Sequence, residues 1–273
     1  MSATSVGAAL ARAKEKGIAR LDAQLLLAHA TGRDRAWVIA HDDDTLEAGA
    51  AAAFERLAAR RAAGEPVAYL VGTKEFRGLA LAVGPAVLVP RPETELLVEL
   101  ALSALPGGRQ PRVVDLGTGS GAIALALKAA SPDARVAASD VSAAALDCAR
   151  ANARRLALDI DWRLGSWWEP WPGERFAVAV ANPPYVADGD PHLAGLAHEP
   201  RGALVSGADG LDAIRAIVAG GYAHLQPGGW LWLEHGHDQD VPVRALLAQA
   251  GFGAITTRHD LAGQPRCSGG QRV

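Results

Sequence analysis

The chain has 273 residues, which is enough for one large domain and a smaller one. Apolar residues make up 49% and charged residues 21%, as in ordinary soluble globular proteins. The formal net charge of −3 gives no general attraction to nucleic acid, and Cys148 and Cys267 are too few for a disulfide framework. No apolar run is long enough to span a bilayer, and the charged N-terminal segment does not fit a signal peptide. We therefore expect a cytoplasmic protein without a membrane partner.

The first 70 residues are expected to form a small helical domain. Alanine and leucine are abundant there, and apolar positions recur three and four residues apart, as at Leu21 and Leu25. Glycines at regular intervals divide this stretch into short helices. We interpret its charged faces as solvated surface.

The stretch from Pro66 to Glu95 changes character, because short apolar runs are separated by glycines. This pattern favours a β-hairpin, and we place a hairpin linker at residues 71–90. From Glu93 to Leu105 the pattern is helical again, and the sequence Pro106-Gly107-Gly108 is expected to close that helix.

Beyond residue 110, short apolar strands alternate with longer helical patterns. This alternation is typical of a parallel sheet with helices on both faces, so we expect residues 91–273 to form one α/β domain. The expected strands are 112–116, 134–140, 160–164, 176–181 and 229–236, and the expected helices are 120–130, 142–158, 211–224 and 241–250.

A glycine-rich turn follows the first of these strands. VVDLGTGSGAIALAL places Gly117, Gly119 and Gly121 between a strand and a helix, where the backbone can turn tightly and a helix N-terminus can face a ligand. A tight turn alone would also explain these glycines. However, Asp140 ends the next strand, and the ends of neighbouring parallel strands line one crevice. Its carboxylate can accept both hydroxyls of a ribose, which favours an adenosine-containing cofactor.

The strand at 176–181 is followed by Asn182-Pro183-Pro184-Tyr185. Asparagine and proline are common at turns, so a simple turn is one interpretation. Proline also fixes its own φ and restricts the preceding residue, which holds Asn182 and Pro183 rigidly. The side-chain oxygen of Asn182 and the backbone oxygen of Pro183 can each accept a hydrogen of an –NH2 group. We interpret the segment as a site where a planar amide or amine is methylated, with Tyr185 stacked over it.

Together these motifs resemble the peptide-chain release factor glutamine methyltransferases over nearly the whole chain. The resemblance is carried by YLVGTKEFRGLALAV, VLVPRPETELL, VVDLGTGSGAIALAL, ANPPYVADGDPHL, EPRGALVSGADGL and LEHGHDQ. It implies a Rossmann-like class I methyltransferase fold, an α/β fold with a seven-stranded, mainly parallel sheet, preceded by a helical domain and a β-hairpin. It also implies methyl transfer from S-adenosyl-L-methionine, leaving S-adenosyl-L-homocysteine, to the side-chain nitrogen (N5) of glutamine in the Gly-Gly-Gln motif of class-1 release factors.

The resemblance assigns roles to residues of the expected crevice. Asn182, Pro183 and Tyr185 are its catalytic group, because they hold the glutamine amide. Asp140 holds the cofactor ribose. The other assigned positions are Gly117, Thr118, Gly119, Ser120 and Gly121 around the methionine part of the cofactor, Trp167 beside its adenine, Asn182 at its reactive end, and Pro184, Arg91 and Glu93 as walls of the substrate site. Ser166 replaces the acidic residue that the family has before this tryptophan, which leaves that polar contact to adenine unassigned.

Two other functions are compatible with these motifs. An Asn-Pro-Pro-aromatic sequence also serves adenine N6 and guanine N2 methylation of nucleic acid; the net acidity and the lack of a separate target-recognition domain stand against it. A non-catalytic, cofactor-binding adaptor is the second, and the complete set of amide-gripping positions stands against it. We expect a monomer whose first 70 residues dock class-1 release factors, with no direct binding of nucleic acid.

Two smaller features were weighed. His235 and His237 could be a metal pair, but no cysteine cluster accompanies them, so we expect no metal. Gly269-Gly270-Gln271 near the C-terminus repeats the tripeptide that the family methylates. We interpret this match as chance, with self-methylation as the alternative.

Overall fold

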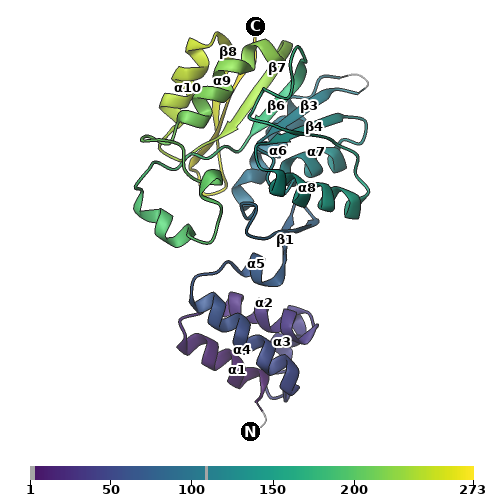
Figure 1. Cartoon of the computed structure of the whole chain (residues 1–273), viewed down its shortest axis with the longest axis vertical. Coiled ribbons are helices and arrows are strands. Elements are labelled where there is room, and N and C mark those ends of the chain that lie inside the picture. Colours follow the sequence, from purple (N-terminus) through teal and green to yellow (C-terminus); the bar gives the residue numbers. More distant parts are fainter. Residues whose placement is uncertain (1–3, 108–109) are drawn as a thin grey trace. The chain divides into compact units, whose positions relative to one another are not determined.

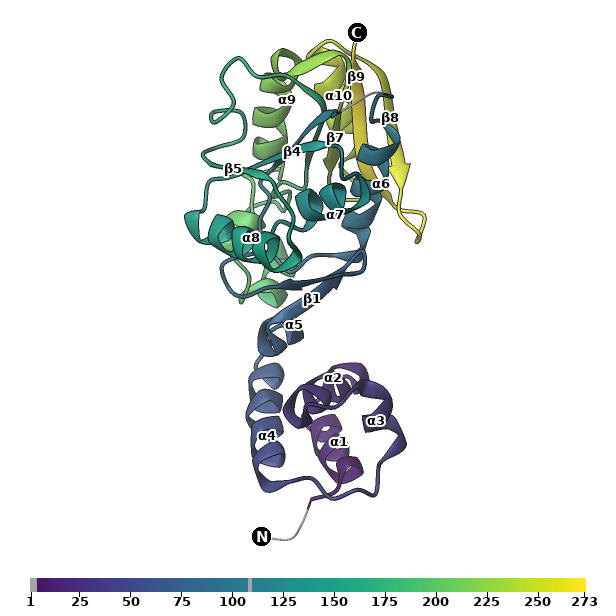
Figure 2. The ribbon, with the colours of Figure 1, turned by 90° about the vertical axis from the view of Figure 1, so that its right-hand side faces the viewer.

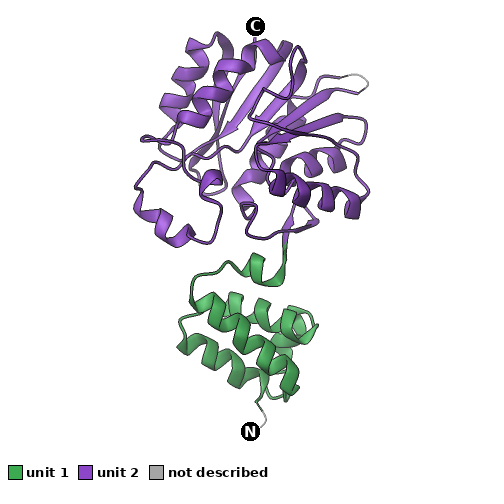
Figure 3. Ribbon diagram, in the orientation of Figure 1, with its two compact units in different colours: residues 1–73 green, residues 74–273 purple. Residues whose placement is uncertain are grey.

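The computed structural model describes residues 4–107 and 110–273 and divides into two compact units, residues 1–73 and residues 74–273 (Figure 3). Residues 1–3 of the expected helical domain lie outside the described residues. Gly108, which was expected to help close the helix before the first strand of the sheet, also lies outside them. Each unit is described below by itself.

Unit 1 is helical, as its periodicity predicts (Figure 1). The side chain of Ser5 caps the first helix by accepting a hydrogen bond from the backbone N–H of Ala8, and Asp34 caps the third in the same way. Leu26, Leu27 and Phe54 are fully buried at its centre. Its helices are α1 (Val6–Glu15), α2 (Arg20–Thr31), α3 (Arg35–Ala40), α4 (Ala48–Ala62) and α5 (Val67–Val71).

The expected hairpin is present but shorter than the stretch in which it was predicted. Its strands are β1 (Thr73–Phe76) and β2 (Leu79–Ala82), and α5 occupies the residues before them. Arg77 and Gly78 turn the chain with φ values of 47° and 77°, as a two-residue hairpin turn requires. Asn152 fixes the hairpin to the large unit, since its Oδ1 accepts from the Ala82 N–H at 2.7 Å and its Nδ2 donates to the Ala82 carbonyl at 3.0 Å.

Unit 2 contains a seven-stranded sheet of order β5-β4-β3-β6-β7-β9-β8, in which β9 runs antiparallel to both of its neighbours (Figure 2). The other pairings are parallel. This arrangement confirms the predicted fold class. The strands are β3 (Arg112–Leu116), β4 (Arg135–Asp140), β5 (Asp161–Leu164), β6 (Phe176–Ala181), β7 (Leu225–Glu234), β8 (Phe252–His259) and β9 (Pro265–Arg272).

Helices cover both faces of this sheet (Figure 1). Side chains alternate along the strands, so that Val113 and Val178 join one buried cluster while Val114 and Ala179 join the other. The first cluster includes residues of α6 (Glu95–Ser103), α7 (Ala122–Ala130) and α8 (Ala143–Leu156), and the second includes residues of α9 (Asp212–His224) and α10 (Asp240–Gln249). A strand covered on both sides must be apolar throughout, which explains the continuous run of β6.

The order of strands reverses direction between β3 and β6, because β4 and β5 follow on one side of β3 and β7 lies beyond β6 on the other. In open parallel sheets, ligands bind outside the carboxyl ends of the strands at such a point. The loops that follow β3 and β6 leave the sheet there and carry the glycine-rich turn and the segment 182–185, while Asp140 ends β4 at the same edge.

Candidate functional site

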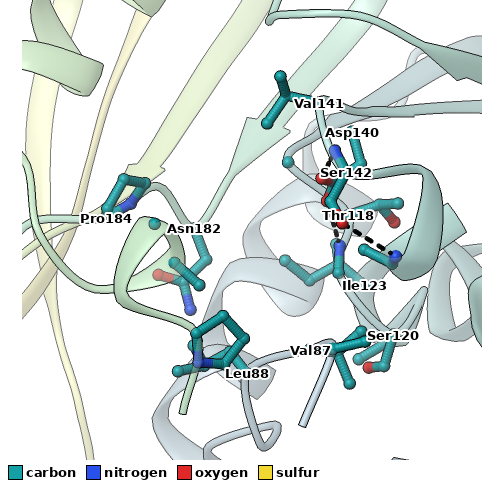
Figure 4. A pocket seen from close by; sticks show the side chains of 18 of the residues that line it. Val87, Leu88, Thr118, Ser120, Ile123, Asp140, Val141, Ser142, Asn182 and Pro184 are labelled. Atoms are coloured by element: carbon teal, nitrogen blue, oxygen red, sulfur yellow. Dashed lines mark hydrogen bonds between the residues drawn. The ribbon is translucent and has the colours of Figure 1, made fainter. Parts of the chain in front are cut away.

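A cavity of about 280 Å³ lies at the carboxyl ends of these strands (Figure 4). Asp140 and Ser142 stand on one side of it in Figure 4, and Asn182 and Pro184 on the other. The predicted site residues that line the cavity are Arg91, Gly117, Thr118, Gly119, Ser120, Asp140, Trp167, Asn182 and Pro184. Gly121, Pro183, Tyr185 and Glu93 do not line it.

The glycine-rich turn forms one wall of the cavity. Gly117, Gly119 and Gly121 have φ values of 75°, 55° and 85°, which L side chains adopt at a cost. A Cβ placed on Gly119 would meet no atom within 4 Å, so open space adjoins the backbone there. A Cβ on Gly121 would instead lie about 3.1–3.2 Å from Leu125, Ala149 and Trp162. Gly121 is therefore needed for packing at the start of α7.

Asp140 joins the loops after β3 and β4. Its Oδ2 accepts a hydrogen bond from the Gly119 N–H at 2.8 Å, and its Oδ1 accepts one from the Ser142 N–H at 2.8 Å. Burial raises the pKa of this carboxyl, and its backbone hydrogen bonds oppose that effect. A carboxylate oxygen has two lone pairs, so both oxygens can still accept hydrogen bonds from the hydroxyls of a ribose.

Asp115 stabilises the glycine-rich turn from the protein interior. This carboxyl is fully buried, and its Oδ2 accepts from the Thr118 hydroxyl at 2.6 Å and from the Ala124 N–H at 3.2 Å. Oδ1 has no hydrogen-bond partner among the described residues. Burial raises the pKa of Asp115 to about 7, and the hydrogen bond from Thr118 opposes the shift.

Trp167 closes the cofactor side of the cavity. Its φ of 43° lies in the left-handed region, and the Ser139 hydroxyl donates to its backbone oxygen at 3.2 Å. The ring lies beside the glycine turn, because a Cβ on Gly117 would be 3.0 Å from its Cζ3. Ser166 also lines the cavity, and its backbone N–H donates to the carboxylate of Glu169 at 3.1 Å. A flat aromatic wall beside a carboxylate and a glycine turn fits an adenosine-bearing cofactor.

On the opposite side, Asn182 donates a hydrogen bond from Nδ2 to Oγ1 of Thr94 at 3.1 Å. Thr94 is buried and ends the short 3-10 helix η1 (Pro92–Thr94). Tyr185 packs against the second apolar cluster, where burial raises its pKa to about 12. Its backbone oxygen accepts a hydrogen bond from the Gln239 side chain at 3.0 Å, which fixes the loop that follows Asn182.

Glu199 connects two segments that line the cavity. Its side chain is 3% exposed and pairs with Arg91, while its Oε2 accepts from the Val89 N–H at 3.0 Å. The helix η3 (Arg201–Ala203) follows directly and contributes to the lining. One buried carboxylate therefore holds the Arg91 segment against the chain that follows β6.

Sequence patterns did not single out Thr94, Glu199 or Glu234 as site residues. Glu234 ends β7, the strand beside β6, and it is 1% exposed. A signal was present, because a carboxyl at the end of an apolar strand belongs to the same edge as Asn182 and Asp140. Thr94 and Glu199 gave no such signal, since their partners are distant in sequence.

His235 and the tripeptide Gly269-Gly270-Gln271 both have structural roles at the sheet. The ring nitrogens of His235 lie 2.8 Å from the Gly236 oxygen and 2.8 Å from Oγ of Ser268. Within the described ranges, no group of three or more His, Cys, Asp or Glu side chains could hold a metal ion.

Among the same residues, none of the helices is both long and apolar enough to cross a membrane.

Gly269-Gly270-Gln271 lies within β9, and Gln271 pairs with Trp230 far from the end of β7 that borders the site. Its Nε2 donates to the Gly228 oxygen at 2.9 Å. A Cβ on Gly269 would overlap the ring of Trp232, so packing accounts for the glycine. The place of Gln271 in the sheet favours the interpretation of the tripeptide as a chance match.

Comparisons with known proteins identify relatives of this chain. A family model described as the PrmC N-terminal domain matches residues 5–72, and one described as the methyltransferase small domain matches residues 93–199. A release factor glutamine methyltransferase of Bordetella pertussis is 51% identical over 259 residues, covering 94% of this chain and 96% of that protein. One of Burkholderia pseudomallei is 53% identical over 264 residues, covering 92% of this chain and 91% of that protein.

A solved structure with a similar fold is a 16S rRNA N2 methyltransferase of T. thermophilus in complex with AdoMet and guanosine. The TM-score is 0.57 and the sequence identity 23%, and the match covers 74% of this chain and 50% of that chain. At this identity the likeness concerns the fold alone, and it agrees with the seven-stranded sheet described above.

Proposed function

This chain belongs to the release factor glutamine methyltransferase family, and we propose that it methylates the side-chain amide nitrogen, N5, of the glutamine in the Gly-Gly-Gln motif of class-1 release factors. The observation that supports this reaction most directly is the position of Asn182. It follows β6 and lies in the wall of the cavity opposite Asp140 (Figure 4). A carboxamide placed between them would face both the cofactor side and the amide-gripping segment.

The cofactor is S-adenosyl-L-methionine, and the residues of the cavity fit it. Asp140 would hold its ribose, Trp167 would lie beside its adenine, and Gly117 to Ser120 would surround its methionine part. When bound, this cofactor supplies a methyl carbon attached to a positively charged sulfur, leaving S-adenosyl-L-homocysteine after transfer. The open space beside Gly119 lets the cofactor approach the backbone of this residue closely.

Asn182 and Pro183 act on the substrate amide. The nitrogen of an amide is a poor nucleophile because its lone pair is delocalised into the carbonyl. In this proposal the side-chain oxygen of Asn182, which lines the cavity, and the backbone oxygen of Pro183, which adjoins it without lining it, accept the two hydrogens of the amide, which raises electron density on nitrogen and orients it. Holding two reactants in line can lower a barrier by about 7–11 kcal/mol. Pro184 and Arg91 line the substrate side of the cavity, and Tyr185 and Glu93 support that side from outside the lining in this proposal.

The nitrogen needs no strong base before transfer. It becomes positively charged only as the new carbon–nitrogen bond forms, and it then releases a proton readily. The role of the chain is therefore to orient the amide and to exclude water from the cavity. The apolar lining from Val87 and Leu88 serves that exclusion.

Mass spectrometry of a purified class-1 release factor after incubation with this protein and S-adenosyl-L-methionine tests the function. We expect one methyl group on the glutamine of the Gly-Gly-Gln motif. A release factor with alanine in place of that glutamine is the control and stays unmodified. Methyl transfer to ribosomal RNA or DNA but not to the factor would contradict the proposal, and cofactor binding without any transfer would indicate an adaptor.

We assign the remaining features of the protein in the same way. Residues 1–70 dock the release factor, residues 71–90 link the domains, and residues 91–273 carry the reaction. The protein acts as a monomer in the cytoplasm, where release factors work, and binds no nucleic acid directly. Light scattering of the purified protein tests the monomeric state, and a binding assay with ribosomal RNA tests the lack of nucleic-acid binding.

A further inference from the structure

We propose that Glu234 and Thr94 are positioning residues that orient the carboxamide of Asn182, so that its oxygen is left for the –NH2 group of the substrate. The inference rests on the proposed function of Asn182. It concerns a buried carboxylate that the reaction as described above does not use.

The three residues meet at the carboxyl ends of two neighbouring strands. Ala181 of β6 pairs with Leu233 of β7, so the next residues, Asn182 and Glu234, are neighbours across the sheet. Thr94 reaches the same place from η1, with its Oγ1 3.1 Å from Nδ2 of Asn182. The Thr94 and Asn182 side chains both lower the pKa of Glu234.

The carboxylate of Glu234 favours one orientation of the Asn182 carboxamide. An asparagine side chain presents either an oxygen or an –NH2 group, and only the oxygen can accept hydrogens from a substrate amide. An ionised Glu234 only accepts hydrogen bonds, so in this proposal the Thr94 hydroxyl turns its hydrogen toward the carboxylate while its oxygen accepts from Nδ2 of Asn182. The opposite orientation would bring the Asn182 oxygen against the oxygens of Glu234. The carboxylate therefore favours the orientation that a methylatable nitrogen requires.

The burial of Glu234 shows that the position is costly. The residue is 1% exposed, and its Oε2 has no hydrogen-bond partner among the described residues. Leaving a buried polar atom unpaired lowers the stability of the fold. A negative group held close to Asn182 also stabilises a substrate nitrogen that becomes positive during transfer.

Other charged or titratable groups face Glu234 from each neighbouring element. Glu93 belongs to η1, Arg266 and Cys267 to β9, and Tyr185 follows β6. Burial raises the pKa of Glu234 to about 7, more than Thr94 and Arg266 lower it. Tyr185 and Cys267 have pKa values raised by burial, so they stay neutral near pH 7. A pH experiment therefore has to distinguish the effect of Glu234 from that of Glu93.

The test compares Thr94→Val, Thr94→Ser and Glu234→Gln in full-length protein with the release factor as substrate. We expect Thr94→Val and Glu234→Gln to lower kcat by about 100-fold, since small errors in orientation have effects of that size. Calorimetry with S-adenosyl-L-homocysteine alone should give an unchanged affinity for all three variants. Thr94→Ser, which keeps the hydroxyl, should retain most of the rate.

The pH profile supplies a reading that a merely structural role would not change. In the wild type, kcat should fall as the pH drops through about 7, because protonated Glu234 becomes a hydrogen-bond donor. Glu234→Gln should lose this acidic limb, and Glu93→Gln should retain it.

Each outcome decides between the proposals. If the wild type methylates the release factor and Glu234→Gln matches it in kcat and pH profile, the positioning role is wrong and the proposed function stands. If the wild type does not methylate the factor, the proposed function itself fails. A Glu234→Gln variant that no longer binds S-adenosyl-L-homocysteine would show a structural role and also overturn the inference.

Discussion

The backbone N–H of Gly119 donates a 2.8 Å hydrogen bond to Oδ2 of Asp140 and thereby joins two loops that follow neighbouring strands. The cofactor side of the cavity is therefore fixed by the protein's own hydrogen bonds. Substitutions at either residue should act on cofactor binding, with different effects on the fold.

Asp140→Ala should weaken binding of S-adenosyl-L-methionine by about 10- to 100-fold, because hydrogen bonds to a charged group contribute about 1.5–3 kcal/mol. Calorimetry measures the affinity. Asp147→Ala is the matched control. Asp147 is an exposed carboxyl on helix α8, which begins shortly after Asp140. Equal affinity of Asp140→Ala and wild type would exclude the ribose-binding role.

Gly119→Ala should lose about 1–2 kcal/mol of stability from its positive φ and also bind the cofactor more weakly. Gly263→Ala separates the two effects, because Gly263 has a φ of 77° with no atom near its Cβ position and does not line the cavity. We expect similar losses of stability and a binding defect only at Gly119. A binding defect in both variants would show that backbone strain alone explains the result.

Asn182→Ala should lower kcat for release-factor methylation by about 100-fold or more, since the substrate nitrogen loses one of its two acceptors. Cofactor binding should remain largely intact, because Asp140 and the glycine turn are unchanged. Rate measurements at saturating cofactor, together with calorimetry, check both expectations. Full activity of this variant would refute the amide-gripping role.

Asp115→Asn should change how stability depends on pH. Burial raises the folded-state pKa of Asp115 from 3.8 to about 7, so the folded protein holds this proton more tightly than the unfolded chain. Its contribution to stability is complete below about pH 4 and is lost as the pH rises to about 7. The melting temperature of the variant should therefore fall less over that range. Exposed Asp133→Asn should follow the wild type, and parallel curves for Asp115→Asn would contradict the expectation.

Gly269→Ala should destabilise the protein by about 1–3 kcal/mol, because the added methyl group overlaps the ring of Trp232. Gln271→Ala loses one exposed hydrogen bond to Gly228 and should cost about 1 kcal/mol or less. Denaturant unfolding measures both. A stable Gly269→Ala variant would mean that packing does not account for the tripeptide.

The periodicity of the sequence predicted the sheet well because most of its strands are covered on both faces. The run Phe176 to Ala181 is fully buried and stands out as apolar. β8 was missed, since its residues are mostly half-buried and their sequence FGAITTRH mixes small and polar side chains. Helix α5 was also missed, because a short apolar run such as VAYLV fits a strand as well as a helix.

The candidate site was predictable where its residues follow strands. Asp140 ends β4 and Asn182 directly follows β6, and parallel topology brings such positions together. Contacts such as Asn182 to Thr94 and Val89 to Glu199 join residues 88 and 110 positions apart. No local pattern encodes such pairs, so the contacts of Thr94 and Glu199 could only be assigned in the folded chain, although both residues lie in stretches that carry the resemblance.

The two walls of the cavity come from different stretches of the chain. Residues 117–167 contribute Asp140 and Trp167 to the lining, while residues 86–94 and 182–203 contribute Arg91 and Asn182. Under the proposed function, exchanging the two segments around Arg91 and Asn182 should change acceptor specificity, while binding of the methyl donor by Asp140 and the glycine turn should be kept. Such grafts offer a route to variants that recognise amide groups in other sequence contexts.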